Sequence, residues 1–165
     1  MAKIIEFIQL INLRKKTEND QQKWVLATGV FDLLHSEHKK FLKVAKAEGD
    51  VLVIGLETDE RVKRIKGTNR PVWSLKKRLL KMSKIAVVDY VFCLPKEFDK
   101  ISDHESLIAQ IKPDILAVSK HTPHLANKRR LLKKYGGKLK IVLPCNPKIS
   151  TSKLIERQNN FKKSP

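Results

Sequence analysis

Two histidines three positions apart, His35 and His38, stand out as residues that could do chemistry. Side chains at this spacing at the start of a helix project toward the same space. Each imidazole can donate a hydrogen bond to a phosphoryl oxygen, and such donors stabilise the charge that grows on a pentacoordinate phosphorus. The pair alone is a weak signal, but the sequence Gly-Val-Phe-Asp at 29–32 precedes it directly after an apolar run. The stretch therefore predicts a site that acts on phosphoryl groups.

An alternation of apolar runs and helical patterns must position these histidines. Strands are predicted over 24–28, 51–56, 90–94, 115–118 and 140–143, and helices over 39–47, 74–84, 105–111, 126–135 and 150–158. Continuous apolar strands separated by helices indicate a parallel sheet that is covered on both faces. With right-handed crossovers, the predicted fold is α/β and Rossmann-like, a doubly wound parallel five-stranded sheet with helices on both faces. Ligands bind at the carboxyl ends of the strands in such sheets, which is where the histidines lie.

The segments before and after the predicted α/β core are expected to form a leading helix and a frayed tail. Residues 4–13 are predicted to form a docking helix with Ile4, Ile8 and Ile11 on one face, followed by a polar connector. The expected organisation is a leading helix and connector over 1–23, a main domain over 24–158, and a frayed tail over 159–165.

The composition limits the class of protein. The 165 residues include 35 Lys+Arg and 17 Asp+Glu, a formal charge of +18 that favours anionic partners such as nucleotides, phosphorylated metabolites or nucleic acid. Aromatic residues make up only 6% and do not interleave with the basic runs, which argues against a stacking platform for single strands. No apolar run approaches the ~20 residues of a membrane-spanning helix, so no membrane partner is expected. Cys93 and Cys145 lie far apart, which fits a reducing cytoplasm.

The sequence GVFDLLHSEHKKFLKVAK, residues 29–46, resembles the G-x-F-D-x-x-H-x-G-H signature of the cytidylyltransferase-like nucleotidyltransferases. The resemblance covers about residues 24–157 and most resembles the adenylyltransferase domain of ADP-heptose synthases. Further motifs in the order of the family are Leu56–Asp59, Arg64–Gly67, Arg70-Pro71, Arg78, Val88–Val91 and Ile149–Ile155.

This resemblance implies an enzyme that joins a nucleoside triphosphate to a phosphorylated small molecule and releases pyrophosphate. His35 and His38 would hold the α-phosphate and stabilise the transition state, and Lys66 would supply positive charge as a third catalytic residue. Magnesium would accompany the triphosphate, ATP being favoured over CTP, and relatives often pair as homodimers. The nucleotide-binding residues implied by the resemblance are Gly29, Val30, Phe31, Arg78, Ser150, Thr151 and Ser152.

Three departures from the family pattern keep two alternatives open. Glu37 replaces the glycine between the histidines, and repulsion between its charge and a phosphate at ~4 Å would reach about 4 kcal/mol at an effective dielectric constant of ~20. The sequence Val-Ser-Lys-His at 118–121 replaces Lys-Gly-Gly-Asp, and the glycine and arginine expected before Ile149 are missing. The alternatives are a catalytically impaired binding protein with this fold and a basic nucleic-acid-binding protein.

No metal site is predicted. His121 and His124 flank a proline without an acidic or cysteine neighbour in helical register, and an ordinary polar loop is the favoured interpretation. Cys145 has no base near it in sequence, so it is not predicted to be a nucleophile.

Overall fold

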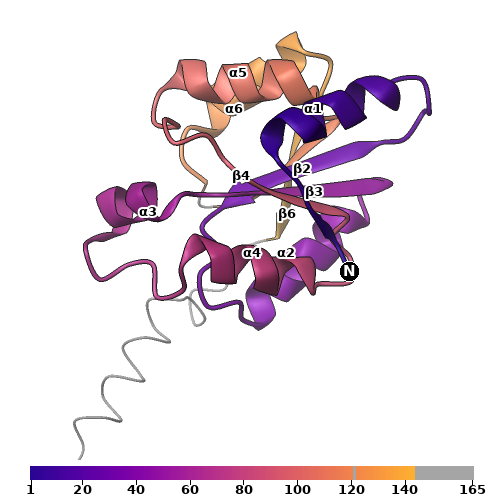
Figure 1. Ribbon diagram of the computed structural model, residues 1–165. Helices are drawn as coiled ribbons and strands as arrows, with labels where there is room; N and C mark the ends of the chain where they lie inside the picture. Colours follow the sequence, from indigo (N-terminus) through magenta and orange to yellow (C-terminus); the bar gives the residue numbers. More distant parts are fainter. Residues whose placement is uncertain (121, 144–165) are drawn as a thin grey trace, which may run out of the picture.

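The computed structural model describes residues 1–120 and 122–143, in which parallel strands form one sheet between two layers of helices (Figure 1). The strands are β1 (Lys3–Ile4), β2 (Trp24–Gly29), β3 (Val51–Leu56), β4 (Tyr90–Cys93), β5 (Ile115–Ser119) and β6 (Lys138–Leu143). The helices are α1 (Phe7–Lys16), α2 (Ser36–Lys46), α3 (Asp59–Lys66), α4 (Leu75–Ser83), α5 (Ile101–Ile111) and α6 (Leu125–Lys134). The predicted helix over 150–158 and the tail lie outside the described residues.

The sheet has six strands in the order β1-β4-β3-β2-β5-β6, so the prediction of a parallel sheet is confirmed and the number five is wrong. The missed strand, β1, pairs in parallel with β4, with Lys3 opposite Tyr90 and Ile4 opposite Val91. Both of its residues are exposed, so the strand has no apolar run that a sequence pattern could detect.

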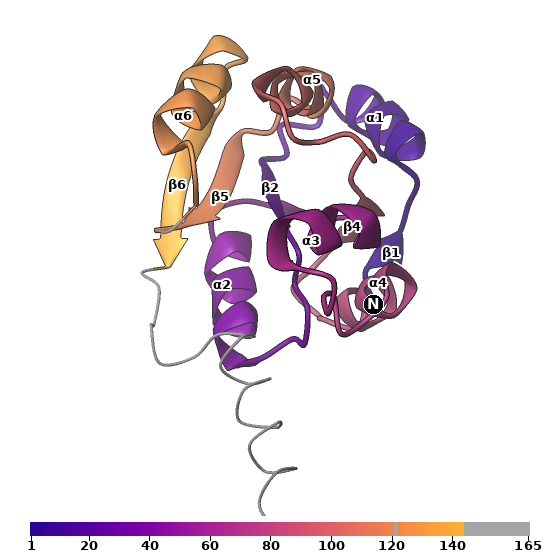
Figure 2. The same cartoon turned by 90° about the vertical axis from the view of Figure 1, so that its left-hand side faces the viewer.

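The central strands are buried on both faces because their successive side chains enter two different cores. In β2, Val25 and Ala27 belong to one core, whereas Trp24 and Leu26 belong to the other. Helices α2 and α4 cover the first face and α1, α5 and α6 cover the second, as the two perpendicular views show (Figures 1 and 2).

Helix α1 differs from its prediction. It begins at Phe7 rather than at residue 4, and its buried residues are Leu10 and Ile11. Ile4 and Ile8 are 53% and 60% exposed, so the predicted shared face of three isoleucines is wrong for two of them. The helix packs beside α5 and encloses the second core.

The strand order changes direction at β2, which lies between β3 and β5. The chain runs from β2 through β3 to β4 on one side, and then crosses to β5 and β6 on the other. The carboxyl ends of strands at such a switch point border the crevice where ligands bind in doubly wound sheets. Helix α3, absent from the prediction, lies at this edge in front of the sheet in Figure 2.

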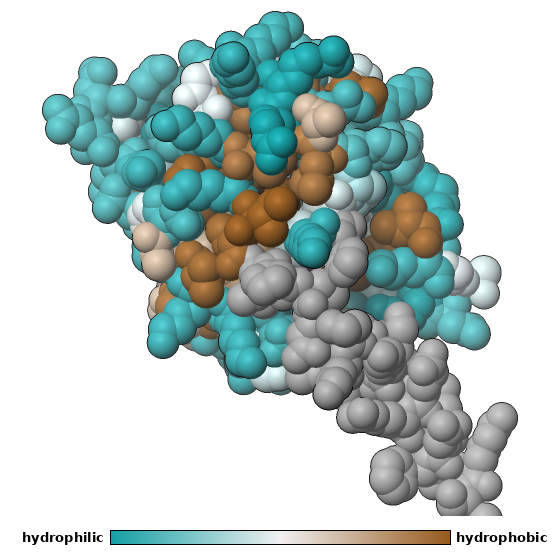
Figure 3. Space-filling view, turned by 180° about the vertical axis from the view of Figure 1, so that it is seen from behind, coloured by the Kyte–Doolittle hydropathy of each residue, from teal (hydrophilic) through white to brown (hydrophobic). Residues whose placement is uncertain are grey.

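The surface agrees with the basic composition. The face seen from behind is mostly hydrophilic, and a band of apolar side chains crosses it (Figure 3). Ile141 of edge strand β6 and Val44 of α2 are among the large apolar residues left exposed. No helix in the described part of the chain is long and apolar enough to span a membrane.

Candidate active site

The loop between β2 and α2 carries the predicted histidines to the carboxyl edge of the sheet. His35 is the N-cap of α2, with extended backbone at φ −118° and ψ 177°, and its side chain makes no capping hydrogen bond. The first backbone N–H groups of a helix have no partner within the helix, and together with the helix dipole they attract anions. The two histidines therefore flank a place suited to a phosphate.

His35 and His38 are close together, as their three-residue spacing predicts. Their ring centroids lie 3.8 Å apart with an interplanar angle of 20°, a stacked arrangement. The Nδ1 atoms of both rings are buried and have no hydrogen-bond partner. Each ring thus keeps unused hydrogen-bonding capacity at the start of α2.

Both imidazoles are neutral at pH 7. Burial lowers the pKa of His35, and the nearby Glu37 carboxylate opposes this effect. The pKa of His38 is lowered to about 3 by burial and by the positive charges of His35 and Lys66, with Asp32 acting in the opposite direction. A neutral imidazole carries one N–H donor, so each ring can donate one hydrogen bond to an anion.

Lys66 is the third residue to which the resemblance assigns catalysis. It is the last residue of α3 and is exposed to solvent, and its charge is felt by His38. The structure thus brings His35 and His38 into contact, and the positive charge of Lys66 contributes to the lowered pKa of His38.

The aromatic ring of Phe31 packs against that of His38. Its ring lies 5.3 Å from that of His38, and its backbone is in the left-handed region at φ 48°. Gly29 makes room for this bend, because a Cβ at that position would lie 3.2 Å from the Phe31 ring. The side chain of Phe31 is buried and its backbone shapes the loop.

Arg78 lies beneath the loop rather than at its surface. Its side chain is 0% exposed, and its Nη2 pairs with Asp59 Oδ1 at 2.6 Å. The remaining bonds of its guanidinium go to backbone carbonyls at Val30 (2.9 Å), Glu57 (2.8 Å) and Trp73 (3.0 Å). Four of the five N–H donors of an arginine are thereby used within the protein. Arg78 therefore holds the loop after β2 to the segments around it, and its guanidinium lies beneath the surface in this structure.

Asp32 ties the same loop to the segment before α4, a role that motif spacing alone did not reveal. Its buried carboxylate accepts hydrogen bonds from the backbone N–H groups of Val72 (2.8 Å) and Trp73 (3.0 Å). The Arg70 Nε also donates to it at 3.1 Å. Asp32 is part of the quoted signature, but its partners lie 38 to 41 positions away in sequence.

Glu37, the main departure from the family signature, forms an ion pair within its own helix. Its Oε1 lies 3.0 Å from the Lys40 Nζ, and its side chain is 13% exposed. The ammonium of Lys40 therefore offsets the negative charge that would otherwise face a phosphate.

The remaining predicted residues cannot be placed. Ser150, Thr151, Ser152, His121 and Cys145 lie outside the described residues. Among residues 1–120 and 122–143, no group of three His, Cys, Asp or Glu side chains could hold a metal ion.

Fold and site together define a doubly wound α/β domain with a pair of histidines at the start of α2. The chain belongs to the cytidylyltransferase-like family, whose model matches residues 26–157. This confirms the resemblance drawn from the motifs.

Individual relatives support the same assignment. The chain is 40% identical over 111 residues to the bifunctional protein HldE of Helicobacter pylori (strain G27), a match that covers 67% of this chain and 23% of that protein. The structure of a lipopolysaccharide core biosynthesis protein from Thermoplasma volcanium GSS1 is 30% identical, with a TM-score of 0.60, covering 76% of this chain and 97% of the other. A pantoate-beta-alanine ligase from Francisella tularensis, with a TM-score of 0.63 and 14% identity, covers 98% of this chain and 78% of the other and shares the fold alone. The chain thus spans about a quarter of the length of the HldE relative.

Proposed function

We propose that this protein transfers a nucleotidyl group from a nucleoside triphosphate to a phosphorylated small molecule and releases pyrophosphate. The observation that carries the proposal is the stacked, neutral pair His35 and His38 at the start of α2. Membership of the cytidylyltransferase-like family supports the class of reaction.

The chemistry follows from this geometry. A phosphate oxygen of the acceptor attacks the α-phosphorus, a new P–O bond forms, and the bond to the leaving pyrophosphate breaks. Charge on the α-phosphoryl oxygens is stabilised by the imidazole N–H donors and by the free amides of the helix start. Lys66 adds a positive charge beside His38. No side chain needs to form a covalent bond to the nucleotide.

The nucleotide and the acceptor follow from the resemblance rather than from the geometry. ATP is the favoured triphosphate because the sequence most resembles the adenylyltransferase domain of ADP-heptose synthases. A sugar phosphate is the corresponding acceptor. Magnesium bound to the triphosphate would offset part of its negative charge. The nucleotide would lie against the backbone of the loop at Gly29 and Val30.

Calorimetry with magnesium and each of ATP, CTP, GTP and UTP tests this function without assuming an acceptor. Selective binding of one triphosphate, followed by pyrophosphate release with a panel of sugar phosphates, is the expected result. Failure to bind any triphosphate would overturn the proposal.

A further inference from the structure

Helices α2 and α4 lie side by side on one face of the sheet. Leu42 and Ala45 of α2 belong to the same core as Met82 of α4, so both helices pack against this face. The two perpendicular views show them in one layer (Figures 1 and 2). Side chains that point away from this core on either helix therefore emerge on the same side of the molecule.

Lysine occupies most of the outward positions of this layer. The exposed lysines without an ion pair among the described residues are Lys39 and Lys43 of α2 and Lys76, Lys77, Lys81 and Lys84 of α4. We call these six residues the lysine face. The only acidic residue of the two helices is Glu37, which pairs with Lys40. The lysine face therefore gives this side of the molecule a positive potential.

Apolar side chains lie among these charges. Leu80 of α4 is 50% exposed and has a lysine four positions before it and another four positions after it. The ring of Trp73 is partly exposed, with the Lys77 Nζ 5.0 Å and the Lys81 Nζ 5.7 Å from its centroid. Val44 of α2 is 37% exposed. The same surface thus offers positive charge and apolar contact to a partner.

Two kinds of large anionic partner match the charge, a nucleic acid and a membrane of anionic lipids. Arginine is the residue of choice for nucleic-acid phosphates, but the one arginine of the two helices, Arg78, is buried. Lysine acts as a point charge, which is sufficient for attraction to anionic headgroups. Leu80 and Trp73 favour the membrane, because apolar and aromatic side chains enter the boundary between headgroups and acyl chains. A phosphate backbone offers Leu80 no apolar contact.

We propose that the lysine face, with Leu80 and Trp73 within it, docks this protein on a membrane surface that contains anionic lipids. Such a contact is peripheral and uses no membrane-spanning helix. It replaces the expectation, drawn from the lack of a long apolar run, that the protein has no membrane partner. The inference is independent of the proposed nucleotidyl transfer.

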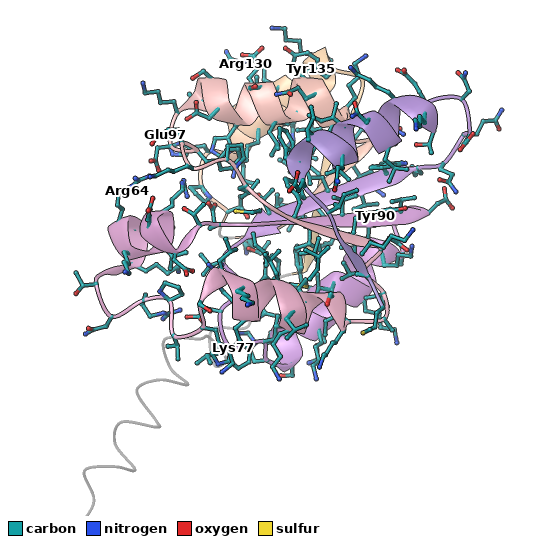
Figure 4. All side chains as sticks on the ribbon, in the orientation of Figure 1. Arg64, Lys77, Tyr90, Glu97, Arg130 and Tyr135 are labelled. Carbon is teal, nitrogen blue, oxygen red and sulfur yellow. The ribbon has the colours of Figure 1, made fainter. Side chains whose placement is uncertain are left out.

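The opposite side of the sheet provides matched controls. Figure 4 shows Arg130 of α6 and Lys77 of α4 on opposite sides of the sheet. The control cations, all exposed and without an ion pair among the described residues, are Lys15 and Lys16 of α1 and Arg129 and Lys133 of α6. A helix is about 10 Å across, so these charges lie beyond the screening length of about 10 Å at 0.1 M salt from a membrane on the lysine face.

Cosedimentation with vesicles of phosphatidylcholine, with or without about 30% phosphatidylglycerol, measures binding at about 0.1 M salt. The wild type should bind the anionic vesicles and not the neutral ones. The variant K76Q/K77Q/K81Q/K84Q should bind them at least about 100-fold more weakly, because each lysine near an anionic surface contributes roughly a fivefold gain. The variant K15Q/K16Q/R129Q/K133Q loses the same charge and should change by less than about threefold.

The apolar part of the contact has its own test. L80S should weaken vesicle binding by about fivefold, because the leucine no longer enters the interface. I8S is its control, since Ile8 of α1 is 60% exposed on the other side of the sheet and should have no effect. Circular dichroism and thermal unfolding confirm that each variant is folded. If the quadruple lysine variant does not fold, K76Q/K77Q and K81Q/K84Q take its place.

Four results would overturn the proposal or part of it. A wild type that does not bind anionic vesicles would refute membrane docking. Equal losses in both quadruple variants would mean that the net charge, and not the lysine face, causes the binding. An RNA oligonucleotide that binds where vesicles do not, and that only K76Q/K77Q/K81Q/K84Q releases, would assign the face to nucleic acid. An L80S variant that matches I8S would refute the insertion of Leu80.

Discussion

The imidazole rings of His35 and His38 stack with their centroids 3.8 Å apart at the first turn of α2. Burial lowers the pKa of both rings, and a charge on His35 would lower that of His38 further, so both rings are neutral at pH 7 in the free protein. The negative charge of an incoming phosphate raises the pKa of both imidazoles, because it attracts N–H donors and favours the protonated form. The local geometry of one helix start thus prepares the site for an anion.

Replacing His38 by asparagine should lower the turnover number by about 10²- to 10³-fold, the usual effect of removing one donor that stabilises charge in the transition state. The dissociation constant for magnesium ATP should change by less than about tenfold, because other donors still hold the ground state. Pyrophosphate release and calorimetry measure the two quantities. K39N, at an exposed position beside it, serves as the control, and a His38 variant with undiminished turnover would contradict the assigned role.

The stability of the protein should fall as the pH falls from 6.5. The pKa of His38 is about 3 in the folded protein, against an ordinary value of 6.5, so the unfolded chain binds more protons between these values. The free energy of unfolding should therefore rise with pH across this window, by at most about 1.4 kcal/mol per unit for this one group. Urea unfolding at pH 5.0, 5.5 and 6.0 should give a smaller slope for H38N than for the wild type. Equal slopes would show that His38 is not held neutral by the fold.

The strands of the sheet could be predicted because they are continuous apolar runs. Val51–Leu56 is buried along its whole length, and its predicted limits are those observed. Strand β1 could not be found, because two exposed residues carry no pattern. Helix α3 was missed since Val62 is its only buried residue, although Thr58 caps it through a hydrogen bond from the backbone of Arg61. A threonine followed by two acidic residues is a start signal that would have located this helix.

The candidate site was predictable where its residues are close in sequence. His35, His38 and the loop at Gly29 belong to one short motif, so their proximity follows from a single turn and helix. The structural role of Arg78 could not be deduced from its motif, because the carbonyl of Val30 that it binds lies 48 positions away in sequence. Sequence alone cannot distinguish an arginine that binds a ligand from one that is enclosed by backbone carbonyls. Only the topology of the sheet brings these segments together.

Replacing Glu37 by glycine should tighten the binding of magnesium ATP, because a negative charge near the phosphates is removed. The gain should be below tenfold, since Lys40 already offsets this charge at 3.0 Å. Helix stability should fall by about 0.5–1 kcal/mol, the cost of glycine within a helix. E37Q separates charge from backbone effects and should give the same gain in affinity without the full loss of stability. Weaker nucleotide binding in both variants would instead mean that Glu37 helps to hold magnesium, and unchanged binding would show that it does not face the phosphates.

Replacing Arg78 by glutamine should destabilise the fold by about 3–5 kcal/mol, because it leaves Asp59 without its buried cation and three carbonyls without a donor. Arg64 provides the matched control, since its ion pair with Asp99 is half exposed and its loss should cost less than about 1 kcal/mol. Chemical denaturation measures both changes.

The variant R78K keeps the positive charge but cannot reach all four acceptors. Its free energy of unfolding should therefore lie between those of the wild type and the glutamine variant. If R78K folds with nearly normal stability, its KM and turnover number show whether the loop at Val30 depends on the guanidinium: a lowered turnover number at wild-type nucleotide affinity is expected. A lysine variant that matches the wild type in both stability and turnover would refute the role of Arg78 as the anchor of this loop.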